Sequence, residues 1–241
     1  NRILSTAEIN ELYKMRPATQ NSISSTFLNN GLVGLWSFDG KDISWGSNTA
    51  YDRSGQGNNG TLVNMSTTTS PIIGKIGQAL KLDGSNDYIN LSTPASLDLG
   101  ASNSTLCSWF KTTDTEGDMI SNGVGTNGHY LLMTYLGKLR GHIWYSGNSN
   151  TIDSNATVNN NTWQHGCQVV DSANIILYVN GSFDKSQALS GSKTGLSSAV
   201  AIGHRGPGSG ISSFDGLMDD VRVYNRALSA NEIKQLYNVG R

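Results

Sequence analysis

The sequence predicts an all-β protein, an antiparallel β-sandwich with one short helix at the C-terminal end. Nine short runs are rich in alternating apolar, β-branched and aromatic residues, clusters of Gly, Asn, Ser and Asp separate them, and good helix formers do not dominate. Many short strands with turn signals between them are typical of sandwiches and barrels. The runs are 31–38, 87–91, 104–112, 129–135, 138–145, 163–171, 174–181, 199–203 and 216–224.

Two pairs of runs predict hairpins, because so few residues separate them. Leu136-Gly137 alone separates the fourth run from the fifth, and a connection of this length and composition favours a tight turn. Ser172-Ala173 separates the sixth run from the seventh in the same way.

The composition excludes several classes of protein. Of the 241 residues 15% are charged, against about 25% in an average soluble domain, and the formal net charge is −1. A near-neutral chain lacks the basic footprint of a nucleic-acid-binding protein. No run approaches the roughly 20 apolar residues that span a bilayer, and no basic cluster indicates a lipid surface. The hydrophobic fraction of 37% is enough to build a core.

An internal repeat links the two ends of the chain. NRILSTAEINELY begins at Asn1 and NRALSANEIKQLY begins at Asn225, with eight identities in thirteen positions at an offset of 224. We expect a fragment of a tandem array; the alternative is a chance match between two short helices. The expected division is 1–17 as the terminal helix of a preceding module, 18–30 as a linker and 31–241 as one domain.

Both copies of the repeat carry a helix start. Ser5 and Ser229 are predicted N-caps, with Glu8 and Glu232 three residues later as capping-box partners. Each helix has one narrow apolar face and therefore needs a partner surface. The apolar faces consist of Ile9, Leu12 and Tyr13 in the first copy and Ile233, Leu236 and Tyr237 in the second.

An ordered series of segments resembles the concanavalin A-like jelly rolls, in particular the laminin G-like and pentraxin-like group. The series is GLVGLWSFDG, YDRSGQGNNGTL, GQALKLDGSNDYINL, TLCSWFKT, NTWQHGCQVVD, IILYVNG and FDGLMDDVRVYNRALSANEIKQLY, which together cover residues 31–241. The resemblance implies a two-sheet antiparallel jelly-roll sandwich. It implies binding and adhesion more often than catalysis.

The two cysteines, Cys107 and Cys167, each fall in a predicted strand. Pentraxins join the corresponding strands by a disulfide, so the resemblance implies a Cys107–Cys167 bridge. The alternative is two buried free thiols, since free Cys often serves as a small core residue. A bridge would indicate an oxidising compartment.

The carboxylates do not match a glycosidase of this fold. Glucanases with this fold carry a Glu-x-Asp-x-(x)-Glu pattern, because retaining hydrolysis needs two carboxylates about 5 Å apart. Glu116 is the one glutamate outside the predicted helices, and the neighbours Asp219 and Asp220 should point to opposite sheet faces. We therefore expect a protein that is not an enzyme.

Calcium is the ion that the sequence favours, because calcium binds carboxylate, amide and carbonyl oxygens in loops. In laminin G-like and glucanase-like relatives a structural calcium ties the first strand region to the last. By this resemblance Asp39, Asp52, Asn59 and Asp220 are the expected ligands. The alternative for Asp39 and Asp52 is that they cap turns.

Pentraxins bind ligands through a pair of calcium ions, but the acidic cluster that holds the pair is absent at Thr126-Asn127 and at His204-Arg205-Gly206. Any ligand must therefore use other contacts. Sugar recognition combines aromatic faces with amide, imidazole and guanidinium groups. The candidates for such a site are Asn122, Asn127, His129, Trp144, Tyr145, Asn148, His204 and Arg205.

The aromatic residues need an alternative interpretation as core. Strand alternation requires that either Trp144 or Tyr145 face inward. The other tryptophans that resemble family core positions are Trp36, Trp109 and Trp163. Trp45 lies in a polar loop and is the aromatic residue expected to be most exposed.

Taken together, the sequence predicts a non-catalytic carbohydrate-binding or adhesion module, secreted or on the cell surface. Its expected partners are a glycan or cell-surface ligand and the neighbouring repeat modules, with no nucleic acid and no membrane insertion. One alternative is a structural spacer or protein–protein adhesion module. A glycan-active enzyme with unusual carboxylates ranks third.

Overall fold

The computed structural model describes residues 28–122, 130–145, 148–191, 199–205 and 213–240. The chain divides into two compact units, residues 1–30 and 31–241, and the second is the β-sandwich. The predicted helix at 1–17 and nearly all of the predicted linker lie outside the described residues.

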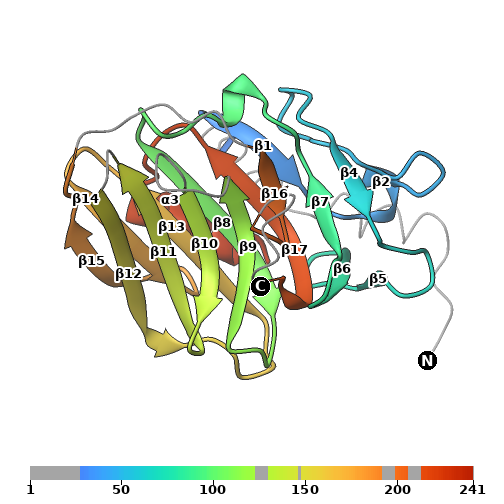
Figure 1. Cartoon of the computed structure of the whole chain (residues 1–241). Coiled ribbons are helices and arrows are strands. Elements are labelled where there is room, and N and C mark those ends of the chain that lie inside the picture. The colour runs from blue at the N-terminus through green and yellow to red at the C-terminus, as the bar shows by residue number, and fades with distance from the viewer. Residues whose placement is uncertain (1–27, 123–129, 146–147, 192–198, 206–212, 241) are drawn as a thin grey trace, which may run out of the picture. The chain divides into compact units, whose positions relative to one another are not determined.

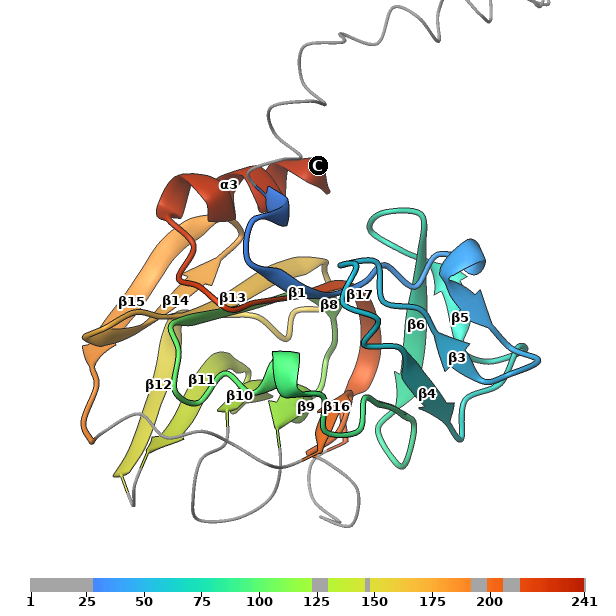
Figure 2. The same cartoon turned by 90° about the horizontal axis from the view of Figure 1, so that it is seen from above.

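Two antiparallel sheets form the sandwich (Figures 1 and 2). The eight-stranded sheet has the order β15-β14-β13-β8-β17-β6-β5, and β1 pairs with β17 beside this path. The nine-stranded sheet has the order β12-β11-β10-β9-β16-β7-β4-β3-β2. The first sheet contains β1 (Leu32–Trp36), β5 (Pro71–Ile73), β6 (Gln78–Asp83), β8 (Ser104–Lys111), β13 (Gln164–Val170), β14 (Asn174–Val179), β15 (Ser182–Ala188) and β17 (Asp215–Tyr224). The second contains β2 (Ile43–Ser44), β3 (Thr49–Ala50), β4 (Gly60–Val63), β7 (Tyr88–Asn90), β9 (Glu116–Asn122), β10 (Tyr130–Tyr135), β11 (Lys138–Tyr145), β12 (Asn148–Thr157) and β16 (Val200–Ile202). Short 3-10 turns cover Gly40–Asp42 (η1) and Ala95–Leu97 (η2).

The core lies between the sheets, and strands such as β11 alternate between buried and half-buried side chains along their length. Trp36 and Phe110 from the first sheet and Leu132 and Ile143 from the second are fully buried there. This alternation is the physical cause of the sandwich, because each sheet hides its apolar face against the other.

All nine predicted runs contain strands: β1, β7, β8, β10, β11, β13, β14, β16 and β17. Both predicted hairpins are confirmed. In the β10–β11 turn Leu136 and Gly137 both have positive φ, 50° and 72°, as a type I′ turn requires. In the β13–β14 connection the carboxylate of Asp171 accepts hydrogen bonds from the main-chain N–H groups of Ala173 and Asn174, both at 2.7 Å.

Helix α3 (Ala230–Val239) lies on the outer face of the eight-stranded sheet (Figure 2). Its predicted capping box, Ser229 with Glu232, is confirmed. Ile233 and Leu236 are buried, and the Tyr237 ring stacks on Trp109 with 5.4 Å between centroids. The narrow apolar face of the helix therefore packs against the outer face of the eight-stranded sheet, as the need for a partner surface predicted.

The positions of the tryptophans only partly follow the expectations. Trp36 is in the sandwich core, whereas Trp109 is buried on the outer side of β8 beneath α3, and Trp163 is half-buried. The expectation for Trp45 is wrong: it is half-buried against the core, and among the described residues Phe183 is a more exposed aromatic residue, at 60%.

Candidate functional site

The β11 sequence KLRGHIWY sorts its side chains between the two faces of the nine-stranded sheet. Leu139, Gly141, Ile143 and Tyr145 point inward and are buried, while the residues between them point outward and are half-buried. Of the two neighbours Trp144 and Tyr145, Tyr145 therefore faces the core and Trp144 faces the surface. Burial raises the pKa of the Tyr145 hydroxyl.

Trp144 forms a flat aromatic surface together with His142. The two rings are stacked with 5.9 Å between centroids and 17° between planes. On the neighbouring strand, the Thr151 hydroxyl lies 3.0 Å from Nδ1 of His142. This contact and the stacking fix the orientation of the imidazole, so the two rings form a rigid platform.

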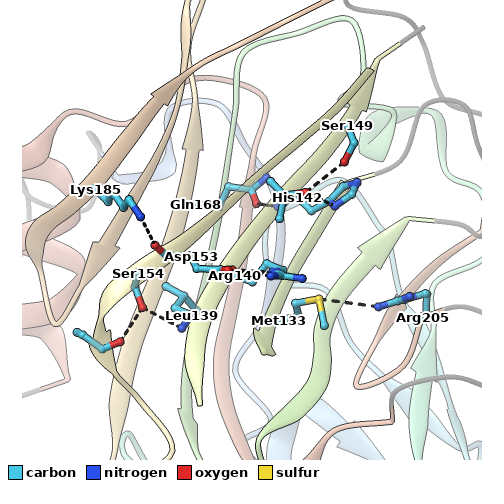
Figure 3. A network of polar contacts seen from close by, with 12 residues as sticks. Met133, Leu139, Arg140, His142, Ser149, Asp153, Ser154, Gln168, Lys185 and Arg205 are labelled. Carbon is cyan, nitrogen blue, oxygen red and sulfur yellow. Dashed lines mark hydrogen bonds and ion pairs between the residues drawn. The ribbon is translucent and has the colours of Figure 1, made fainter. Parts of the chain in front are cut away.

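Arg140 is held by two groups, a carboxylate and an aromatic ring, and lies near His142 (Figure 3). Nε and Nη2 donate to the two carboxylate oxygens of Asp153 at 2.6 and 2.8 Å, and the guanidinium lies 3.5 Å from the centroid of the Tyr135 ring. The hydrogen bond from Arg140 holds the pKa of Asp153 below its usual value. The pair is therefore ionised at neutral pH, with a net charge of zero.

A second arginine–aspartate pair joins Asp118 of β9, two strands away, to Arg205, which follows β16. Nε of Arg205 donates to Asp118 Oδ2 at 2.8 Å, and Nη2 lies 3.4 Å from Oδ1 and 3.8 Å from the sulfur of Met133 (Figure 3 shows the contact with Met133). Asp118 is fully buried, and burial raises its pKa to about 6, against the opposing effect of Arg205. We name the outward surface formed by these residues the polar face. Its half-buried members are Tyr135, Arg140, His142, Trp144, Thr151, Asp153 and Arg205, and the buried Asp118 and Met133 contact Arg205.

The remaining predicted ligand residues lie around the polar face or away from it. Asn122 is buried at the end of β9, and Asn148 is exposed at the start of β12. The ring of His204 lies beside the ring of Tyr88 on β7, with 5.3 Å between the ring centroids. Asn127 and His129 lie outside the described residues.

Gln168 supports the polar face from the opposite sheet. Its Oε1 crosses the sandwich and accepts the main-chain N–H of His142 at 2.9 Å (Figure 3). The approach is possible because residue 141 is glycine: a Cβ there would lie 2.7 Å from Oε1 of Gln168 and 3.0 Å from Leu177 Cδ2. The strand that carries Arg140 and Trp144 is thus fixed from behind.

We expect Gly141→Ala to destabilise the fold by about 1–3 kcal/mol, the usual cost of overpacking a core. The added methyl group would push Gln168 away from His142. Chemical denaturation of the variant measures the effect. An unchanged midpoint with an unchanged slope would contradict the tight contact seen here.

The predicted calcium ligands are engaged in other contacts. Asp52 accepts four hydrogen bonds at 2.7–3.0 Å, from the main chain of Leu35 and Asn58 and from both donors of Ser54. Asn59 Oδ1 accepts the Asp52 N–H at 2.9 Å. These hydrogen bonds hold the loop after β3 against β1. A calcium ion bound at Asp52 would have to displace these bonds.

Asp220 and Asp39 also have partners. Asp220 binds Arg222 through both oxygens at 2.9 and 3.1 Å, and Asp39 Oδ1 accepts the main-chain N–H of Gln78 at 3.0 Å. Among the described residues, the oxygens of Asp39, Asp52 and Asp220 do not come within 4.8 Å of one another as a group. Calcium at these residues stays a prediction.

Asp219, which was not among the predicted ligands, has one carboxylate oxygen without a hydrogen-bond partner in the described part of the chain. It is fully buried; Oδ2 accepts the Ile76 N–H at 2.8 Å, and Oδ1 has no partner within the described residues. Burial raises its pKa to about 7, with Asp220 and Asp39 adding to the rise.

The expectation that Asp219 and Asp220 point to opposite faces is wrong. The register of β17 shifts between Asp219 and Arg222, and φ of Asp220 is +47°.

The predicted disulfide is confirmed: Cys107 and Cys167 are bonded, and they are a directly opposite pair on β8 and β13. Both are fully buried on the outer side of the sheet, next to His165. Burial lowers the pKa of His165 to about 4. Among the described residues these three form the one cluster with metal-ligand spacing, but the sulfurs are bonded to each other, so the cluster is structural.

None of the helices in the described part of the chain has the length and apolar character needed to cross a membrane.

Two packed antiparallel sheets with a capping helix define a jelly-roll sandwich. The chain belongs to the concanavalin A-like lectin/glucanases superfamily, whose laminin G-like family model matches residues 83–234. A search of curated protein sequences gave no match.

Solved structures share the fold at low sequence identity. The binding domain of Paraclostridial Mosquitocidal Protein 1 is 19% identical with a TM-score of 0.69, and the match covers 88% of this chain and 53% of that one. Domain 4 of AbnA, an extracellular arabinanase from Geobacillus stearothermophilus solved with arabinotriose, is 23% identical with a TM-score of 0.64; the match covers 86% of this chain and 98% of that domain. The receptor binding domain of botulinum neurotoxin C/D mosaic serotype is 16% identical with a TM-score of 0.66, covering 88% and 52%. This chain therefore spans about half the length of the two toxin domains.

Proposed function

We propose that this protein is a non-catalytic binding module that recognises carbohydrate through the polar face. The observation that carries the proposal is the combination of a fixed aromatic platform, Trp144 on His142, with the Arg140–Asp153 pair beside it. Aromatic faces bind the C–H surfaces of sugars, and paired guanidinium and carboxylate groups bind hydroxyls. Arabinotriose in the domain of the arabinanase supports a sugar ligand for this fold.

The carboxylates of the polar face do not suit glycoside hydrolysis. Asp118 and Asp153 are separated by three strand spacings, about 14 Å, whereas hydrolysis needs carboxylates roughly 5–10 Å apart. Asp118 has the raised pKa of an acid catalyst, but it is fully buried and both oxygens face Arg205. Glu116 stands two residues before it on β9 as in the glucanase pattern, but no second glutamate follows.

The proposal also includes the location of the module and its neighbours in the parent protein. The buried disulfide supports a secreted or cell-surface protein, because disulfides persist in oxidising compartments. The repeat of the α3 sequence at residues 1–13 supports neighbouring modules of the same kind as partners.

We expect Trp144→Ala to weaken binding to the recognised polysaccharide about tenfold or more, because the stacking surface is lost. Affinity electrophoresis and calorimetry against a polysaccharide panel measure it. Phe183→Ala is the matched control, since Phe183 is an exposed aromatic residue on the other sheet. Equal binding by Trp144→Ala and wild type would rule out the polar face as the site, and release of reducing sugars by the isolated protein would overturn the non-catalytic assignment.

A further inference from the structure

We propose that the polar face takes an uncharged oligosaccharide, lying across the strands from β12 towards β9, and does not take a uronate, sialylated or sulfated glycan. The inference rests on the proposed function and names the class of its ligand.

The charges of the polar face are already neutralised from within. Arg140 is paired with Asp153 and Arg205 with Asp118, at 2.6 and 2.8 Å. An anionic sugar would therefore meet Asp153 beside Arg140, and an Arg205 whose charge is already balanced by the buried Asp118.

The lysines that border the polar face are held as well. The amino group of Lys138 donates to the main-chain oxygen of Asn155 at 2.5 Å and to the Thr157 hydroxyl at 3.3 Å. The amino group of Lys185 reaches across from β15 to the main-chain oxygen of Asp153 at 3.2 Å (Figure 3). Both amino groups thus donate along β12 and add little to the recognition of an anion on the platform.

Displacing an aspartate to admit an anion is unfavourable. The bidentate geometry of Arg140 and Asp153 is the strong form of such a pair, and a freed carboxylate would stand beside the new negative charge. At Asp118 the cost is larger, because a fully buried carboxylate would lose its cation.

A hydroxyl group has no such conflict. The bonds to Asp153 use two of the five N–H groups of the Arg140 guanidinium, and the Asp153 oxygens retain lone pairs as acceptors. One sugar hydroxyl can accept from the arginine and donate to the aspartate at the same time. The two pairs therefore match neutral hydroxyl groups better than charged ones.

The layout of the pairs indicates a chain of sugars. Asp118, Met133, Arg140 and Asp153 are directly opposite partners on β9, β10, β11 and β12. Neighbouring strands are about 4.8 Å apart, so the row measures about 14 Å from end to end. Tyr135 and the Trp144–His142 platform flank the row on β10 and β11. Asp118 and Met133 are buried, and Arg205, which contacts both, is the accessible group at the β9 end of the row. A row of this length with aromatic surfaces suits an oligosaccharide better than a single sugar.

The test titrates the full chain with neutral polysaccharides (linear arabinan, xylan, galactan) and with anionic ones (polygalacturonate, heparin), at low and high salt. We expect binding to a neutral polymer that changes less than about twofold with salt, because no net charge is involved. Asp153→Asn should lose about tenfold in that affinity and should gain binding to polygalacturonate that high salt removes, since it exposes the Arg140 charge. Asp215→Asn makes the same change in net charge on an exposed residue of the other sheet and should behave as wild type.

The outcomes separate the two proposals. Salt-sensitive binding of wild type to polygalacturonate or heparin alone would overturn the neutral ligand while keeping a glycan-binding module. No binding to either class would overturn the proposed function itself. Neutral binding that Asp153→Asn leaves unchanged would also overturn the present inference, because the pair would then lie outside the contact.

Discussion

Replacing both Cys107 and Cys167 by Ala lowers the free energy of unfolding by about 4 kcal/mol, the largest loss of stability that we expect. The two cysteines are 60 residues apart, and opening a loop of this length restores much conformational entropy to the unfolded chain. Both lie fully buried beneath α3, so the alanines also leave small voids in the layer that contains Trp109 and His165.

Chemical denaturation under oxidising and reducing conditions measures this effect. Wild type in reductant should approach the double variant, and the double variant should not respond to reductant. A difference of less than about 1 kcal/mol between wild type and variant would contradict the stabilising role of the disulfide.

Arg205→Ala should cost about 3 kcal/mol at pH 8 and much less at pH 5. At pH 8 the fully buried Asp118 is ionised and would lose its only cation in the described structure, which is the costly way to break a buried pair. The folded pKa of Asp118, about 6, lies above the ordinary value of 3.8, so folding favours the protonated form. Its contribution to stability is therefore present below about pH 4 and is lost as the pH rises through 6.

Without Arg205 the folded pKa of Asp118 rises further, so Asp118 is neutral at pH 5 and the variant recovers. Unfolding free energies measured from pH 5 to pH 8 test this. Adding Asp118→Asn to Arg205→Ala should remove the pH dependence, because a neutral amide replaces the carboxylate. A penalty for Arg205→Ala that is the same at both pH values would show that lost packing, not the unpaired charge, causes it.

The fold was predictable where burial leaves an apolar pattern in the sequence, but EGDMISN of β9 was missed although six of its seven residues are buried. β11 alternates strictly between buried and half-buried residues, and β8 and β13 are buried on both sides because the core covers one side and α3 the other. β12 and β15 escaped prediction because NSNTIDSNAT and SFDKSQA are mainly polar; β15 is almost wholly exposed, and β12 is only partly buried. Such strands are held by hydrogen bonds to the neighbouring strands. The hydrophobicity of a strand's own residues does not indicate those bonds.

The site was predictable only in part, for a related reason. Trp144 and Arg205 were found from residue type, and the alternation in KLRGHIWY could also have placed Arg140 and His142 beside Trp144. The aspartates Asp118 and Asp153 were missed because their partners are 87 and 13 residues away in the chain. Pairings of this kind depend on strand order and register, which one sequence does not reveal.

The register of β1 on β17 determines how this module responds to mechanical load. Leu32 lies opposite Tyr224, so the two ends of the sandwich leave the sheet side by side. Tension applied through these ends peels α3 away and then opens the β1–β17 ladder one pair at a time, which needs less force than shearing all its hydrogen bonds at once. The crosslink between β8 and β13 then limits the extension, because the residues between Cys107 and Cys167, about 200 Å of extended chain, stay closed in a loop. The crosslink therefore shortens the fully extended module by about 200 Å.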